Sequence, residues 1–148
     1  MKNDRVILVK NKIAACPSFI FLGLNFSGSE YRQGTSLLGE SFVLNFSNNK
    51  MRSVQVIFHP RSDNKDYFLI NILNQNNNEA FNIEDWQKKH GLEEKPDPFR
   101  LINYSGAFEE RLDSFVSYLN DFFCDERIVS ILQGYSWEAV AFDWAGMR

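Results

Sequence analysis

The chain has 148 residues, of which 44% are hydrophobic and 24% are charged, and it contains 14 Phe, 5 Tyr and 3 Trp. This composition excludes a disordered chain, and the length fits one globular domain over residues 1–148 that needs neither a disulfide nor a metal for stability. The net charge of -3 and the pI near 5.4 argue against direct nucleic-acid binding, which usually needs a strongly basic face.

The charge is unevenly distributed along the chain. Up to Pro60 there are seven basic and three acidic residues, whereas the remainder holds nine basic and 16 acidic residues. An asymmetry of this kind bears on partners and on rates of encounter rather than on the fold.

No segment has the pattern of an export signal or a membrane span. The apolar run from Val6 to Val9 is interrupted by Lys10 and Lys12, and a signal peptide needs an apolar stretch of about 7–15 residues. The run from Phe19 to Phe26 is also far shorter than a membrane-spanning helix. We therefore expect a cytoplasmic protein with no membrane contact.

The two cysteines, Cys16 and Cys124, lie far apart in the sequence and lack a CxxC spacing. They are predicted to be reduced, partly buried thiols.

The first quarter of the chain gives a mixed pattern. A helix is predicted from Asp4, its capping residue, to about Ala15, although the run VILV fits a strand equally well. Pro17 ends this element, and the following apolar segment is predicted to be buried, with no assigned type. The stretch FSGSEY around Gly28 has the composition of a turn.

Three segments, ESFVLNF, RSVQVIF and DYFLINIL, have the period of two that is typical of strands. The first two place Phe42, Leu44 and Phe46, and then Val54, Val56 and Phe58, on one face. The third places Phe68, Ile70 and Ile72 on one face and Tyr67, Leu69 and Leu73 on the other.

The short SNNK segment between the first two strands predicts a hairpin. The apolar faces coincide only if the numbers of facing residues sum to an even number, as for Leu44 opposite Val54, and this requires a loop of odd length. The simplest such loop is Asn48, Asn49 and Lys50, with an Asn in the left-handed conformation. The looser turn HPRSDNK leads into the third strand, so an antiparallel meander is predicted.

The polar stretch from Asn74 to Glu79 is predicted to be a loop. The segment FNIEDWQKKHG then predicts a short helix, with Asn82 as its cap and Gly91 at its end. Phe81 and Trp86 have the spacing of a hydrophobic staple.

The last third of the chain predicts two helices and a tail. After the extended, proline-stiffened LEEKPDPF, a long helix capped by Ser105 is expected, and a final helix is expected from a break near Asp125 to Gly134. The tail YSWEAVAFDWAGMR fits a last strand or a strap over the core. One side of it carries Val140, Phe142 and Trp144. Strands followed by helices predict an α+β domain, an antiparallel meander sheet with helices packed on one face.

The long helix has an apolar side and an acidic side. Its apolar stripe, at the 3.6-residue period, consists of Phe108, Leu112, Phe115, Val116, Leu119, Phe122 and Phe123. From Ser105 to Glu126 the acidic residues are Glu109, Glu110, Asp113, Asp121, Asp125 and Glu126, against the single base Arg111. Either bases elsewhere in the fold neutralise these acids, or the surface stays negative and attracts a basic partner.

No catalytic, cofactor-binding or metal site is predicted. His59 ends a strand, and His90 lies in the last turn of a helix, where a cation suits the helix dipole. The Cys and His residues lack the ligand spacing of a zinc site, and the nucleophile and phosphate-loop motifs are absent from the sequence. A nucleophile–base pair of Cys124 with a histidine would require that folding bring them together.

The order of the segments resembles that of small bacterial immunity proteins of toxin–immunity systems, including contact-dependent growth inhibition. The resemblance rests on FLGLNFSGSEYR, the strands, a Trp-bearing short helix, the long amphipathic helix and a terminal FDWAGMR. It implies a stoichiometric toxin inhibitor without catalytic residues, monomeric or weakly dimeric, that covers a cognate toxin domain, often a nuclease with a basic surface.

The predicted partner-binding residues combine the acids of the long helix with aromatic residues, because interface hot spots favour Trp and Tyr. They are Glu110, Asp113, Asp121, Asp125, Glu126, Tyr118 and Trp137, with Trp144 as a further candidate. The competing interpretations are a small enzyme with an unrecognised cleft and a small-ligand-binding domain.

Overall fold

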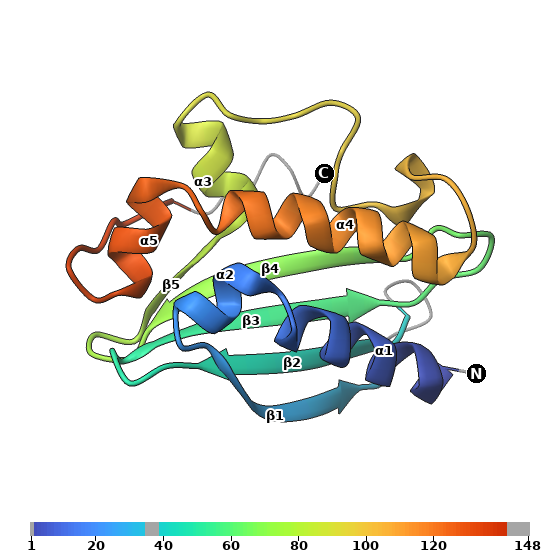
Figure 1. Ribbon diagram of the computed structural model, residues 1–148, viewed down its shortest axis with the longest axis horizontal. Coiled ribbons are helices and arrows are strands. Elements are labelled where there is room, and N and C mark those ends of the chain that lie inside the picture. Colours follow the sequence, from blue (N-terminus) through green and yellow to red (C-terminus); the bar gives the residue numbers. More distant parts are fainter. Residues whose placement is uncertain (1, 35–38, 142–148) are drawn as a thin grey trace.

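Five strands form one antiparallel sheet in the computed structural model, which describes residues 2–34 and 39–141 (Figure 1). The strands are β1 (Asn25–Arg32), β2 (Ser41–Ser47), β3 (Arg52–His59), β4 (Tyr67–Asn74) and β5 (Glu79–Asn82). Their order in the sheet is their order in the chain, so the predicted antiparallel meander is confirmed.

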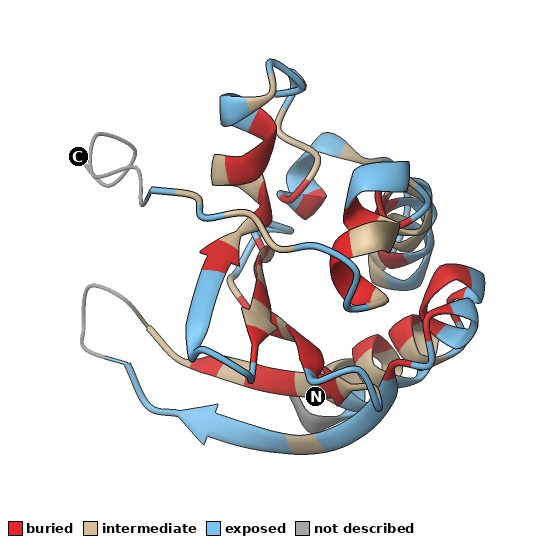
Figure 2. Ribbon diagram, turned by 90° about the vertical axis from the view of Figure 1, so that its left-hand side faces the viewer, coloured by how far each residue is buried: buried red, intermediate tan, exposed pale blue. Residues whose placement is uncertain are grey.

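The helices pack against one face of this sheet. They are α1 (Lys2–Ala14), α2 (Pro17–Phe21), α3 (Ile83–Lys89), α4 (Phe108–Phe122) and α5 (Glu126–Leu132), with a short 3-10 helix η1 (Leu101–Asn103) before α4. Figure 1 shows α1, α2 and α4 in front of the sheet, and the side view in Figure 2 places them together on one side of it. The predicted α+β class is therefore confirmed.

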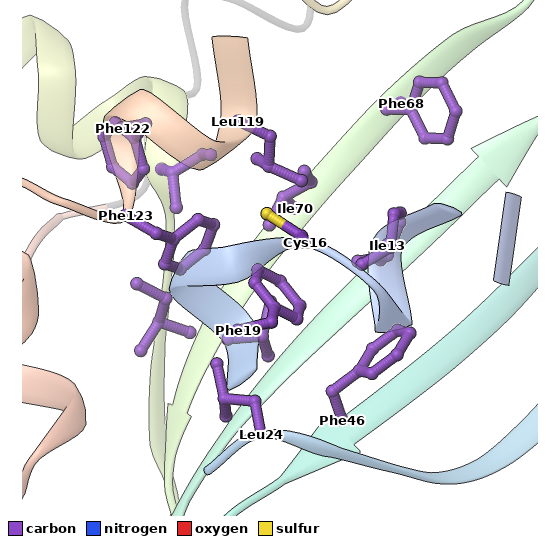
Figure 3. Close-up of a cluster of buried hydrophobic side chains, with 14 of the residues drawn as sticks. Ile13, Cys16, Phe19, Leu24, Phe46, Phe68, Ile70, Leu119, Phe122 and Phe123 are labelled. Carbon is purple, nitrogen blue, oxygen red and sulfur yellow. The ribbon is translucent and has the colours of Figure 1, made fainter. Parts of the chain in front are cut away.

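The core lies between these helices and the inner face of the sheet. Phe19 of α2 meets Phe46 of β2 and Phe123 after α4 edge-on, with ring centroids 5.4 Å and 4.9 Å apart (Figure 3). Phe115 of α4 stacks on Phe68 of β4 at 4.2 Å. The predicted apolar stripe of α4 thus faces the predicted apolar faces of the strands, as burial of both surfaces requires.

The hairpin between β2 and β3 differs by one position from the prediction. Leu44 lies opposite Val56 rather than Val54. The numbers of facing residues still sum to an even number, so the apolar faces coincide as predicted, but the loop shifts to residues 49–51. The left-handed residue is Met51, with φ 57°, and not an Asn. Asn48 is used otherwise, because its side chain accepts from the Lys50 amide and donates to the Leu132 carbonyl at 2.8 Å, which holds the end of α5.

The segment around Gly28 is a strand and not the predicted turn. The apolar run before it divides into α2, which Pro17 begins, and the start of β1. A bulge between Phe26 and Gly28 shifts the register against β2. β1 is an edge strand with mostly exposed side chains, which explains why it lacks the alternation of the central strands.

Of the three predicted helix caps, one is confirmed and two are wrong. Asn82 accepts from the amides of Glu84 and Asp85 at the start of α3, and the predicted loop before it is bounded by the end of β4 at Asn74 and the start of β5 at Glu79. Asp4 is not a cap, because α1 begins at Lys2. The predicted break near Asp125 is confirmed, and Asp125 caps α5. The cap of α4, however, is Ala107 rather than Ser105, because the chain turns at Gly106, with φ 102°, before the helix begins.

Residues 135–141 form a strap over α3 and β5. The Trp137 ring packs against Phe81 at 5.3 Å, and its indole N–H donates to Glu79 at 3.2 Å. The buried Arg52 guanidinium donates to the carbonyls of Ile131 and Ser136, which fixes the turn into the strap. Val140 lies within the strap, whereas Phe142 and Trp144 lie outside the described residues. None of the described helices is long and apolar enough to cross a membrane.

Candidate functional site

The first half of the acidic α4 is neutralised from within the fold. Lys12 of α1 lies 3.1 Å from Glu109 and 2.8 Å from Asp113, and these hydrogen bonds raise the pKa of Lys12. Glu110 accepts from the Ala107 amide at 3.1 Å, which is the half of a capping box that needs no side chain at the N-cap. Two of the predicted partner-binding acids, Glu110 and Asp113, therefore have structural contacts of their own.

The second half of the acidic stretch remains negative. Asp125 caps α5 and pairs with Arg127 at 3.0 Å, and the hydrogen bonds from Arg127 keep the pKa of Asp125 below its usual value. Asp121 and Glu126 are exposed, and neither has a hydrogen-bond or ion-pair partner among the residues that the structure describes. These two carboxylates are the acids of this stretch that are free to meet a partner.

The two predicted aromatic residues are packed rather than free. The Tyr118 hydroxyl accepts from Gln87 at 2.6 Å, its ring meets Phe99 edge-on, and burial raises the pKa of the phenol. Trp137 holds the strap to β5. The Arg52 guanidinium lies over the Trp137 ring, with its carbon 5.4 Å from the centre of that ring. Both rings are half-buried, so each offers only part of its surface to a partner.

A surface that the sequence did not predict lies beside Asp121 and Glu126. Ile20 and Phe21 of α2 are 66% and 71% exposed, although α2 buries Phe19 completely. A pocket of about 310 Å³, which Phe21 lines and Ile20 does not, opens between α2, α4 and α5. We call this surface the α2 patch; it consists of Pro17, Ser18, Ile20, Phe21, Asn120, Phe123, Cys124 and Val129.

Asp121 and Glu126 flank the α2 patch without lining its pocket. The Cys124 amide donates to the main-chain carbonyl of Asp121, and Glu126 precedes Val129 by three residues on α5, so each acid lies within one turn of a residue that lines the pocket. Glu126 also lines a second pocket, together with Ser136 and Trp137 of the strap. Cys124 is exposed in this pocket, whereas the sequence predicted a partly buried thiol, because the chain turns outward between α4 and α5. Cys16 is buried as predicted.

The sequence contains a signal for the patch within the apolar segment that is predicted to be buried. A helix of five residues cannot bury four consecutive residues of the run SFIF on one side, since successive side chains point about 100° apart. Once Ser18 and Phe19 face inward, Ile20 and Phe21 must face out.

The two histidines lie in separate environments. The His90 ring is 2.8 Å from Glu138 of the strap, which also accepts from the Trp86 indole at 2.9 Å and pairs with Lys89 at 2.7 Å. The His59 ring stacks on Tyr67 at 4.3 Å, and within residues 2–34 and 39–141 neither of its nitrogens has a hydrogen-bond partner. Burial and the charge of Arg61 lower the pKa of His59 to about 4, so this ring is neutral at pH 7.

A larger cavity, of about 730 Å³, lies at the end of the sheet where β1 and β3 finish. Arg5 of α1 and Arg61 after β3 line it together with Tyr31, whose hydroxyl donates to Glu40 at 2.9 Å. Arg5 also lies 3.5 Å from the buried carboxylate of Asp66. Asp66 thus offsets the charge of Arg5, whereas the Arg61 guanidinium donates to the carbonyls of Glu40 and Pro60.

Among the described residues, no group of three or more His, Cys, Asp or Glu side chains is arranged to hold a metal ion. No protein-family model, curated protein or solved structure matches the chain.

Proposed function

We propose that the protein is a non-catalytic binding protein, and specifically an immunity protein that neutralises a cognate toxin domain by stoichiometric binding. The observation that carries the proposal is the α2 patch, where Ile20 and Phe21 stay exposed near an apolar pocket and near two carboxylates that have no partner among the described residues. Large exposed apolar side chains rimmed by polar residues are typical of protein-binding surfaces.

The patch is rigid enough to act as a preformed docking site. The Ser18 amide donates to the Asn120 side chain at 2.9 Å, and Cys16 donates to the same oxygen, so α2 is fixed to α4. Phe19 anchors it to the sheet from beneath (Figure 3). A partner can therefore bury Phe21 without first ordering this helix, which lowers the entropic cost of binding.

The charge of the rim selects the kind of partner. Asp121 and Glu126 favour a basic surface that carries an apolar side chain able to enter the pocket. A toxin domain that acts on nucleic acid has such a basic surface, and its binding here would occlude it. The layout resemblance to immunity proteins of contact-dependent inhibition systems supports the same interpretation, and it implies a cytoplasmic site of action.

Co-purification tests the proposal. The chain is expressed with the C-terminal domain encoded by the gene immediately upstream, and the complex is isolated at low and at high salt. We expect a complex that weakens with salt, because the rim carboxylates contribute through charge. The double variant Asp121→Lys/Glu126→Lys should weaken it further, whereas Glu93→Lys, at an exposed acid in the loop after α3, should not. A complex that is insensitive to both salt and the double variant would remove the patch from the interface.

A second candidate function follows from the cavity at the end of the sheet. Its volume of about 730 Å³ is that of a small-molecule site, and Arg5 and Arg61 suit a carboxylate or phosphate group. Thermal unfolding with inorganic phosphate and with small dicarboxylates tests this candidate. A rise in the unfolding temperature that Arg5→Gln abolishes would favour a ligand-binding domain, and an unchanged temperature would dismiss it.

A further inference from the structure

The two edges of the sheet differ in what covers them. Beside β5 lies the strap, with Trp137 bonded to Glu79, whereas no described strand pairs with the outer edge of β1. An uncovered edge presents main-chain N–H and C=O groups that can pair with another strand. The outer edge of β1 is therefore open to strand addition.

Glu30 and Arg32 determine which strand fits there. The two residues lie on the same face of β1, away from the helices, and their side chains are 59% and 50% exposed and 3.4 Å apart. Charges on an edge strand usually oppose pairing with other chains. Here, however, the two charges are opposite in sign and two residues apart, which makes the strand complementary to an antiparallel copy of itself.

The register of such a pair follows from the pleat and from the charges. The two faces of the combined sheet continue only if the numbers of facing residues sum to an even number. A pair centred on Glu30 or on Arg32 places like charges opposite each other, and a pair centred on Ser29 places Glu30 opposite Gly28. Only the pair centred on Tyr31 sets Glu30 opposite Arg32 of the second copy, and it does so twice. We propose that β1 is a homodimerisation edge, at which two copies of this chain pair antiparallel about Tyr31.

The other face of β1 supports this register. Tyr31 is 53% exposed although its ring packs on Phe42 at 5.0 Å, and in the pair it faces Tyr31 of the second copy. Aromatic cross-strand pairs of this kind stabilise antiparallel strands. The bulge at Ser27 limits the regular part of the strand to a few residues, so the interface is small and the dimer is weak.

Sedimentation of the chain alone tests the proposal, independently of whether a toxin binds. Over concentrations from about 10 µM to about 1 mM, the range of weak interfaces, the weight-average mass should rise towards that of a dimer. Glu30→Arg places arginines opposite each other and should raise the dissociation constant about tenfold. The swap Glu30→Arg/Arg32→Glu restores both pairs and should return the constant to within about threefold of the original.

Each contrary outcome overturns the proposal. A chain that stays monomeric up to about 1 mM has no such edge interface. A dimer that tolerates Glu30→Arg, or that the double swap fails to restore, pairs through another surface or in another register. Circular dichroism of both variants establishes that β1, whose altered side chains are exposed, still folds.

Discussion

Phe19 and Phe21 offer a matched pair of substitutions within one short helix. They lie two residues apart in α2, yet Phe19 is completely buried and Phe21 is 71% exposed. If the α2 patch is a binding surface, replacing each ring by alanine should separate stability from binding. Phe19→Ala should destabilise the fold, and Phe21→Ala should weaken partner binding.

The expected sizes follow from the contacts. Phe19→Ala removes a ring that meets Phe46 and Phe123, and such a change costs about 3–5 kcal/mol, or a fall of about 10 °C in the unfolding temperature of a domain this long. Phe21→Ala removes a mostly solvated ring and should change the free energy of unfolding by less than about 1 kcal/mol. As a hot spot, Phe21 should contribute about 2 kcal/mol to binding, which is about thirtyfold in Kd.

Thermal unfolding and calorimetric titration with the upstream-encoded domain measure the two effects. Ile7→Ala is the control, because Ile7 is an apolar residue of α1 that is 53% exposed and lies outside the patch. The reasoning is refuted if Phe21→Ala binds as tightly as Ile7→Ala does. A fall in unfolding temperature after Phe21→Ala as large as that after Phe19→Ala would show that the ring belongs to the core.

Two further predictions concern carboxylates near α3. Burial, together with the charge of Asp97, raises the pKa of Glu84 from 4.5 to about 7. The folded state thus binds this proton more tightly than the unfolded state, so the charged form destabilises the fold above pH 7, and the effect disappears as the pH falls towards 4.5. Glu84→Gln should raise the free energy of unfolding by about 1–3 kcal/mol at pH 8 and leave it unchanged at pH 4. An equal change at both pH values would contradict this. Although burial opposes its charge, hydrogen bonds from Lys89, His90 and Trp86 keep the pKa of Glu138 below its usual value. Glu138→Gln should therefore loosen the strap by about 1–2 kcal/mol, seen as faster proteolytic cleavage within residues 135–141, and an unchanged cleavage rate would show that the strap is held elsewhere.

The central strands could be predicted from the sequence because the pattern of apolar residues that identifies each of them lies within the strand itself. In β2 and β3 the alternation of apolar and polar residues identifies the inner face. β4 carries apolar residues on both faces, so its inner face follows from its register with β3. The caps at Asn82 and Asp125 are local as well, since each side chain bonds to amides two or three residues away. The edge strand β1 lacks this signal, because an edge strand that packs little against the helices needs no apolar face.

The surface could be predicted only in part, because it depends on contacts between distant segments. The charge of α4 is visible in the sequence, but its neutralisation by Lys12 depends on the packing of α1 beside α4. Likewise, the exposure of Phe21 depends on which side of α2 faces the sheet. The Asn48 side chain bonds to residues 26 and 84 positions away, so its role in the hairpin could not be read from the hairpin sequence.

A titration of toxin activity tests the central claim most directly. The activity of the upstream-encoded domain is measured against increasing amounts of the chain. Stoichiometric occlusion predicts a linear fall in activity that reaches zero at one equivalent. For Phe21→Ala, whose Kd is expected to be higher, it predicts a curved titration with residual activity at one equivalent. Full activity at a large molar excess of the chain would contradict the claim that this protein neutralises that domain by binding it.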